Sequence, residues 1–332
     1  MKPIALDAMG GDQMPGAAVK GALQAAQAGI PVILIGDEPT LKAELSKQGG
    51  SLEIHHAGDV MGMDDHASDV RRRRDSSIMQ AMSLVKEGAA SACVSMGHSG
   101  ATMAAALLVL GRIKGIERPA ILANMPVTEG YVALIDAGAN ADCRPAHLQQ
   151  FAIMGSAYAK TFYEKAEPTV GLMSIGEEEG KGNELTREAY TLLKETPSIN
   201  FYGNVEGRDL FKATTDVYVT DGFTGNVVLK LAEGEARFIF GWLREKIMAS
   251  GPVTKLGAKL VKPILKQLAD RMDPAEIGAQ PLLGVRGYAF IGHGSSDERA
   301  VKNALKNAQV LVEADLVGKI TADLERLETV TA

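Results

Sequence analysis

The chain has 332 residues, of which 46% are hydrophobic and 23% are charged, and its formal net charge is -6. This composition is typical of a globular protein and predicts a large apolar core that needs no disulfide bonds. The negative charge argues against a broad nucleic-acid interface, which requires a basic surface. No apolar run is long enough to span a membrane.

The cysteines and histidines show no metal-binding pattern. The two cysteines, Cys93 and Cys143, form no CxxC pair, and the six histidines form no cluster with ligand spacing. We therefore expect no metal site. Isolated cysteines are typical of a reducing cytosol, and the first residues contain too short an apolar run for a signal peptide. Cys93 lies in an apolar segment and is predicted to be a buried strand residue rather than a nucleophile.

Short apolar runs alternate with helical patterns along the whole chain. The expected strands are residues 4–6, 31–35, 52–56, 92–95, 120–125, 131–136, 169–175, 201–205, 217–220 and 290–293. The expected helices are residues 16–29, 39–48, 78–86, 100–110, 147–162, 183–194, 226–246 and 295–323, and residues 75–77 are expected to cap the third. Such alternation predicts an α/β fold, a mostly parallel sheet with helices on both faces. We expect a single domain over residues 1–332.

One further helix, residues 252–272, is expected as an amphipathic insertion within this domain. Its apolar residues recur at three- and four-residue steps, and lysines occupy the opposite stripe. The apolar stripe includes Leu256, Leu260, Ile264 and Leu268. Pro263 predicts a break or kink. A cationic amphipathic helix can lie on an anionic membrane, but the more ordinary case is a surface helix packed on its own core or on a partner subunit.

Five glycine-bearing loops follow expected strands and precede expected helices. Backbone N–H groups in such loops, with the positive field of a helix N-terminus, can hold an anion. The candidate ligands are Asp7, Gly10, Gly11, Gly97, His98, Ser99, Gly100, Gly182, Asn183, Asp221, Gly222, Gly225, His293 and Ser295. Each loop alone can equally be a structural turn, and none is a GxGxxG or P-loop motif. Because ligands bind at the carboxyl ends of parallel strands, the five loops together predict one phosphate-binding cleft.

Two residues in these loops are candidates for catalysis. Lys181 lies between two glycines, where a lysine can stabilise a phosphate or a developing oxyanion. Asn226 can offer its amide to an oxyanion, or it can cap the following helix. The neighbouring acidic run at residues 177–179 is expected to be solvated.

A basic run, Arg71, Arg72, Arg73 and Arg74, precedes the expected cap at residue 75. It is either a solvated charge run or a docking patch for an acidic protein or a phosphate group. No GxSxG motif is present, so the sequence gives no support to a serine acyl-enzyme.

Several longer motifs follow one another from about residue 4 to the final helix. They are DAMGGD, DSS, SMGHSGA, GANADCRPAHLQQFAIMGSAYA, GEEEGKGNE, NVEGRDLF, VTDGFTGNVVLK, GAQPLLGVRG and HGSS. In this order they resemble the phosphate acyltransferase family. Lys181 and Asn226 match the family pattern in their loops. Gln13 stands where a histidine is common, and His98-Ser99 stand where Asn-Thr is common, so no role is carried over to Gln13.

The resemblance implies a Rossmann-like α/β/α fold related to phosphate acetyltransferases, a homodimer, and a cytoplasmic protein peripherally associated with the inner face of the cell membrane. It implies transfer of a long-chain fatty acyl group from acyl carrier protein to inorganic phosphate, without a cofactor. The product, an acyl phosphate, would pass to a membrane-bound glycerol-3-phosphate acyltransferase in phospholipid synthesis. The resemblance also favours the membrane interpretation of residues 252–272 and the reading of the arginine run as a carrier-protein docking patch.

The expected mechanism is direct attack of phosphate on the thioester carbonyl. The enzyme then has to align phosphate with the carbonyl carbon and to stabilise the oxyanion. We expect Lys181 to neutralise phosphate and Asn226 to steady the oxyanion. Three alternatives stay open: a short-chain phosphate acetyltransferase, a non-catalytic membrane scaffold, and a nicotinamide dehydrogenase, for which the GxGxxG loop is missing.

Overall fold

One sheet of eleven strands organises the molecule, in the order β3-β2-β1-β4-β11-β10-β5-β6-β9-β7-β8. The computed structural model describes residues 2–331, so the first and last residues of the predicted domain lie outside the described part. The strands are β1 (Ile4–Asp7), β2 (Val32–Gly36), β3 (Glu53–His56), β4 (Ala92–Ser95), β5 (Ala120–Pro126), β6 (Tyr131–Ile135), β7 (Thr169–Met173), β8 (Asn200–Val205), β9 (Val217–Val219), β10 (Ala279–Leu283) and β11 (Ala289–Gly292). Every predicted strand is present. The additional strand, β10, contains Pro281, a residue that argues against a central strand.

Two sets of parallel strands run in opposite directions within this sheet. Strands β3, β2, β1, β4 and β11 are mutually parallel, and so are β6, β9, β7 and β8. Between the two sets, β10 is antiparallel to both β11 and β5, and β5 is antiparallel to β6. Three antiparallel pairings thus set the relative direction of the two sets.

Helices cover both faces of the sheet and form an apolar cluster with each. Ile4 and Leu6 belong to one cluster and Ala5 to the other, because successive side chains of a strand point to opposite faces. The first face is covered by α1 (Gly16–Gln27), α2 (Glu38–Gln48), α5 (Pro145–Phe162), α6 (Glu184–Lys194), α9 (Glu298–Glu313) and α10 (Leu316–Thr331). The second is covered by α3 (Ser77–Lys86), α4 (Ser99–Val109) and the start of α7 (Gly222–Ala249), with the short helices η1 (Ala67–Arg71) and η2 (Gly207–Lys212). The predicted three-layer, mostly parallel α/β/α fold is confirmed.

Two details of the predicted helices differ from the structure. The long helix expected over residues 295–323 is divided into α9 and α10, because Asp315 adopts a left-handed conformation with φ 50°. The third helix begins where expected, but Ser76 caps it without a side-chain hydrogen bond.

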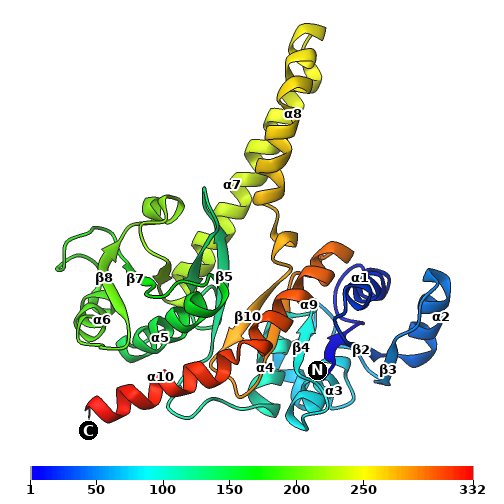
Figure 1. Ribbon diagram of the computed structural model, residues 1–332, viewed down its shortest axis with the longest axis horizontal. Helices are drawn as coiled ribbons and strands as arrows, with labels where there is room; N and C mark the ends of the chain where they lie inside the picture. Colours follow the sequence, from blue (N-terminus) through cyan, green and yellow to red (C-terminus); the bar gives the residue numbers. More distant parts are fainter. Residues whose placement is uncertain (1, 332) are drawn as a thin grey trace.

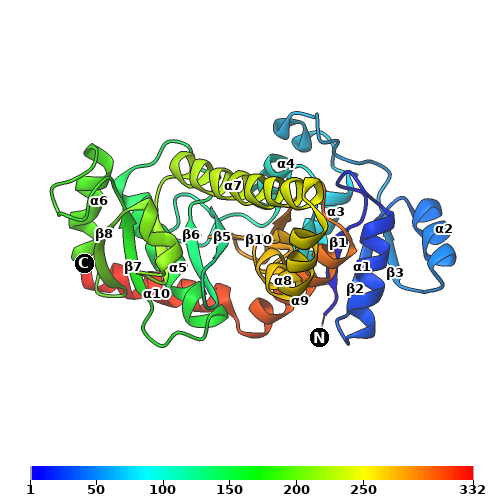
Figure 2. The ribbon, with the colours of Figure 1, turned by 90° about the horizontal axis from the view of Figure 1, so that it is seen from above.

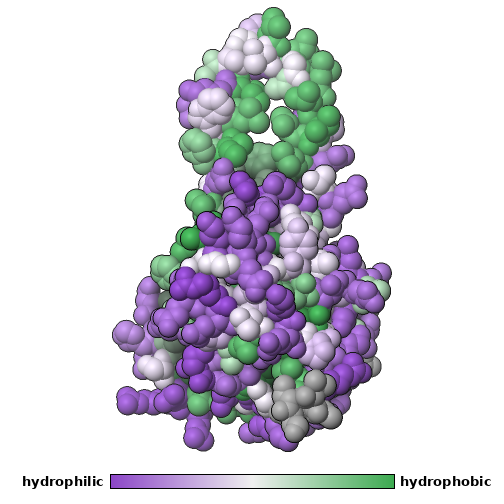
Figure 3. Space-filling model, turned by 90° about the vertical axis from the view of Figure 1, so that its left-hand side faces the viewer, coloured by the Kyte–Doolittle hydropathy of each residue, from purple (hydrophilic) through white to green (hydrophobic). Residues whose placement is uncertain are grey.

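Helices α7 and α8 (Pro252–Arg271) project from the body of the molecule as a pair (Figures 1 and 2). We call residues 238–271 the helical arm. No side chain of α8 is buried, and Leu256, Leu260, Ile264 and Leu268 are exposed by 62%, 75%, 68% and 50%. Apolar residues gather on the upper part of the arm, whereas the body below it is mainly hydrophilic on the face shown in Figure 3. No helix within residues 2–331 is both long enough and apolar enough to cross a membrane.

The sequence predicts a break or a kink at Pro263; the break is absent, because α8 continues through this residue. A proline leaves one carbonyl of the preceding turn without its helical partner. On an exposed helix that carbonyl is accessible to water, and the neighbouring α7 packs along α8, so the helix persists.

Candidate active site

Loops after β1 and β4 touch each other through their glycines. Asp7, which is 3% exposed, accepts hydrogen bonds from the N–H of Gly10 at 3.2 Å and from the Ser95 hydroxyl at 2.7 Å. Ser95 in turn accepts from the N–H of Gly97 at 3.1 Å. A Cβ on Gly10 would lie 2.9 Å from the Cα of Gly97, so only glycine fits there. The Asp7 carboxylate is thus engaged in holding the two turns together.

The loop after β11 joins the same group. The N–H of Asp12 donates to the carbonyl of Gly294 at 2.8 Å. Gly11, at φ 118°, has room only for a hydrogen, since a Cβ would lie 3.0 Å from the Met96 carbonyl oxygen. Nδ1 of His293 lies 2.8 Å from the hydroxyl of Ser295. We call these three loops, residues 9–12, 96–99 and 293–296, the glycine-loop cluster.

Helix α4 begins inside the glycine-loop cluster. His98 is its N-cap, and its Nδ1 accepts a hydrogen bond from the N–H of Ala101 at 3.1 Å. Ser99 is the first helical residue and is exposed. A Cβ on Gly100 would lie 3.0 Å from that of Ala67. The cluster therefore presents the positive end of α4 and a free serine side chain next to backbone N–H groups.

A second group of loops surrounds the start of α7. Asp221 caps the helix by accepting from the N–H and the hydroxyl of Thr224, each at 2.8 Å. The helix cap is therefore Asp221, which leaves the side chain of Asn226, exposed in the first turns of α7, available to a ligand. Gly222 donates to the carbonyl of Asn140 at 2.7 Å. A Cβ on Gly225 would lie 1.9 Å from the carbonyl oxygen of Asp136, so the glycine is required.

Asp136 organises the loop on which α7 rests, and the sequence interpretation assigned it no role. It is fully buried and accepts hydrogen bonds from Ile121, Gly138, Ala139 and Asn140, including 2.7 Å from the N–H of Asn140. Burial raises its pKa, and these hydrogen bonds oppose the rise. The motif GANADCRP begins at Gly138, two residues after Asp136, and nothing in the local sequence signals that the Asp136 carboxylate is buried.

The loop that carries Lys181 lies at the carboxyl end of β7. Lys181 is exposed, and its N–H donates to the carbonyl of Glu178 at 3.0 Å. Asn183 caps α6 by accepting from the N–H of Thr186 at 2.9 Å. Gly182 has φ 107°, and a Cβ there would collide with the Thr186 hydroxyl. Gly182 and Asn183 therefore shape this loop, and Lys181 is its exposed cation.

A groove with a cavity volume of about 260 Å³ joins the glycine-loop cluster to the start of α7. Its polar lining includes Ser99, His293 and Asn226, and Gly138 lies beside Asn226. Lys181 is not among the lining residues. The structure thus brings three of the predicted site residues to one groove.

The groove brings together three of the five predicted loops, those after β4, β9 and β11, whereas Lys181 in the loop after β7 does not line it. Strands β7 and β9 run opposite to β1, β4 and β11, so these loops do not come from one set of parallel strands, as the sequence analysis assumed. Local patterns do not reveal strand direction, because three antiparallel pairings between distant segments decide it.

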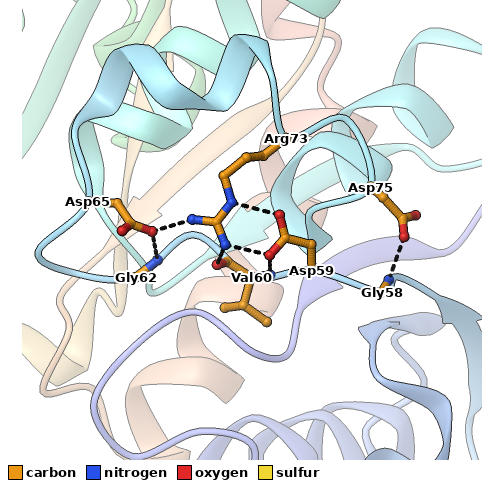
Figure 4. A network of polar contacts seen from close by, with 7 residues as sticks. All are labelled: Gly58, Asp59, Val60, Gly62, Asp65, Arg73 and Asp75. Carbon is orange, nitrogen blue, oxygen red and sulfur yellow. Dashed lines mark hydrogen bonds and ion pairs between the residues drawn. The ribbon is translucent and has the colours of Figure 1, made fainter.

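The basic run is only partly available to a partner (Figure 4). Arg73 pairs with Asp59 and Asp65 and donates to the carbonyl of Val60 at 2.6 Å. The hydrogen bond from Arg73 lowers the pKa of Asp59. Arg71, Arg72 and Arg74 are exposed. A docking patch at this site therefore comprises these three arginines, and Arg73 holds the loop beneath them.

Neither cysteine is suited to act as a nucleophile. Cys93 is buried in β4, and burial raises its pKa. Burial also raises the pKa of Cys143 to about 11. Among the described residues, no three His, Cys, Asp or Glu side chains are grouped as metal ligands.

A family model described as "Fatty acid synthesis protein" matches residues 2–319. A protein from Thermus thermophilus, named "Phosphate acyltransferase", is 56% identical over 324 residues, covering 98% of this chain and 99% of that protein. A protein of the same name from Deinococcus radiodurans is 56% identical over 286 residues, covering 84% and 79%.

The fold is shared with solved phosphotransacetylases. The enzyme from Streptococcus pyogenes superposes with a TM-score of 0.61 at 17% identity, covering 93% of this chain and 94% of that one. A 4-hydroxythreonine-4-phosphate dehydrogenase from Klebsiella pneumoniae gives 0.57 at 12% identity, covering 94% and 100%. At these identities the likeness concerns the fold alone.

The family model and the high identity to these relatives show that the protein is an acyltransferase of lipid synthesis. The chain belongs to the phosphate acyltransferase family.

Proposed function

We propose that this enzyme transfers a long-chain fatty acyl group from acyl carrier protein to inorganic phosphate. A phosphate oxygen forms a bond to the thioester carbonyl carbon, the carbon–sulfur bond breaks, and the released thiolate takes up a proton. The observation that carries the proposal is the groove in which Ser99 and His293 of the glycine-loop cluster and Asn226 of α7 line one cavity with apolar walls. Such a cavity suits a substrate with an anionic and a fatty part.

Phosphate is assigned to the glycine-loop cluster. Gly10 and Gly11 let the neighbouring loops approach closely, and the N-terminus of α4 adds a positive field. His293 and Ser295 lie beside the same loops as further polar groups. Asp7 shapes the turns and is a positioning residue.

Asn226 is assigned to the oxyanion and Lys181 to charge neutralisation. The Asn226 amide is available because Asp221 caps α7 in its place. Lys181 is exposed and does not line the groove, so its assignment rests on its place as the cation of the glycine-bearing loop after β7. Gly222 and Gly225 allow α7 to start close to Asp136, which sets the position of Asn226.

The defining experiment is release of free carrier protein from palmitoyl-carrier protein in the presence of phosphate, with the acyl phosphate trapped by hydroxylamine. Phosphate-dependent release with a hydroxamate product supports the proposal. A folded preparation that releases no carrier protein contradicts the proposed activity and favours the alternative of a non-catalytic membrane scaffold. Preference for acetyl-CoA over the long-chain donor would make the enzyme a short-chain phosphate acetyltransferase instead.

Carrier protein is proposed to dock at Arg71, Arg72 and Arg74. Their side chains are exposed around the loop that Arg73 holds, and carrier proteins of this type are acidic partners for such a patch. Replacing Arg72 by glutamate is expected to raise KM for the acylated carrier about tenfold without a change in kcat, because rim charges act mainly on encounter. If the glutamate variant keeps the wild-type KM for the acylated carrier at low salt, the arginines are not part of the docking surface.

The helical arm is proposed to contact the inner face of the cell membrane in a cytoplasmic homodimer. The exposed apolar residues of α8 lie next to lysines, and this combination favours an anionic lipid surface. Acyl phosphate would leave there for a membrane-bound glycerol-3-phosphate acyltransferase.

A further inference from the structure

We infer that the acyl chain of the substrate lies along the first half of α7, with its thioester at Asn226 and its methyl end toward the base of the helical arm. The inference rests on the proposed function and names the part of the groove that would recognise the fatty chain. It is carried by the chemistry of the groove walls and by the order of residues along α7.

One wall of the groove is a stripe of α7. The stripe consists of Asn226, Leu229, Lys230, Ala232, Glu233 and Ala236. Residues 226 to 236 span about 15 Å at the rise of an α-helix. Beyond the amide, the stripe continues with three apolar side chains and with Lys230 and Glu233, which neutralise each other as an ion pair at 3.1 Å. A polar start and an apolar continuation match a thioester followed by a hydrocarbon.

The opposite wall is the sheet. Ile121 and Met125 of β5 and Ile291 of β11 line the groove, and they are 8%, 2% and 4% exposed. These side chains form a preformed apolar surface that a flexible aliphatic chain can cover, and Asn124 and Gln280 are polar lining residues on the same side.

The far end of the groove lies at the base of the helical arm. Arg271 and Met272, where α8 returns to the body, line it. Arg271 donates to the carbonyls of Val127 at 2.8 Å and of Gly130 at 2.9 Å, so this end is held in place by the turn between β5 and β6. The lining is thus rigid enough to act as a measure of chain length.

Small side chains on α7 provide the test. Ala236 lies ten positions beyond Asn226, and Ala232 lies six positions beyond it. Ala236→Phe is expected to shorten the groove at its far end, and Ala232→Phe closer to the thioester. Glu235→Phe is the matched control, because Glu235 is exposed on the same helix and does not line the groove.

The measurement is kcat/KM for octanoyl-, dodecanoyl- and palmitoyl-carrier protein with each variant. Ala236→Phe is expected to lower the palmitoyl-to-octanoyl ratio about tenfold, the effect of losing burial of about two methylene groups. Ala232→Phe is expected to lower the dodecanoyl-to-octanoyl ratio as well, and Glu235→Phe neither ratio. Since each ratio is taken within one preparation, partial unfolding does not change it.

An unchanged ratio in both alanine variants would overturn the inference. Equal loss with all three donors would also overturn it, because that pattern places the carrier's own prosthetic arm in the groove. Binding of palmitate by calorimetry, weakened in Ala236→Phe and unchanged in Glu235→Phe, tests the groove without turnover. A failure of the proposed function would therefore leave this binding intact, whereas a failure of the inference would not.

Discussion

The two halves of helix α7 meet very different surroundings although they form one continuous helix. In the first half, Gly225 contacts the loop of Asp136, and Leu229 and Ala232 pack at the groove. In the second half, Phe238 and Trp242 are exposed by 70% and 53%, with only α8 alongside (Figure 2).

The two surroundings match the two roles proposed for this helix. The first half is positioned by its cap and by close contacts with the sheet, which suits precise placement of a catalytic amide. The second half exposes large apolar side chains, which isolated soluble helices avoid unless another surface covers them. We therefore expect substitutions in the two halves to separate turnover from membrane binding.

The largest expected effect is that of Asn226→Ala in the first half. Loss of one oxyanion donor lowers kcat by about 100- to 1,000-fold, roughly 3–4 kcal/mol of transition-state stabilisation. Vesicle binding should stay at the wild-type level.

Lys181→Ala, outside α7, is expected to raise KM for phosphate with a smaller loss of kcat. The hydroxylamine assay checks both, and near-normal turnover in a folded variant would refute the corresponding assignment.

A smaller effect is expected from Leu256→Glu in the helical arm. It removes an apolar side chain that is 62% exposed and adds a negative charge facing anionic lipid. Vesicle binding should weaken about tenfold, since apolar burial and charge attraction both fall, while turnover of a soluble donor stays unchanged. Flotation with vesicles of phosphatidylglycerol measures this. Equal binding by the variant would return α8 to the role of a surface helix or a subunit contact.

The smallest effect is expected at Gly234, between the two halves. A Cβ there meets nothing within 4 Å, and the glycine is exposed. Gly234→Ala should therefore stabilise the protein by about 0.5–1 kcal/mol through helix propensity. Urea unfolding measures this change in stability, and turnover and vesicle binding are measured on the same variant. A loss of either activity would show that the halves depend on flexibility at this position.

Much of the fold could be predicted because its signals are local. Apolar runs such as residues 4–6 and 92–95 became strands, and helical periods between them became helices on both faces. The strand missed, β10, contains Pro281, and the division between α9 and α10 depends on one left-handed residue, Asp315. Both depend on tertiary context that outweighs local preference.

The candidate site was predictable only in parts. Glycines in strand-end loops indicated anion binding, and Asn226 and Ser99 do line one groove. The buried carboxylate of Asp136 escaped notice, because an aspartate in a loop is normally solvated. Arg73 was expected to be free, but it pairs with acidic residues that precede it by 8 and 14 positions.

By itself the sequence determined which segments are strands, helices and glycine turns, because periodicity and turn chemistry act over a few residues. It also carried the family motifs that identify the enzyme. Only the tertiary structure decided how the turns are distributed, because strand direction depends on pairings between residues far apart in the chain. The same long-range pairing brought α7 across β5, so the groove between them exists only in the folded molecule.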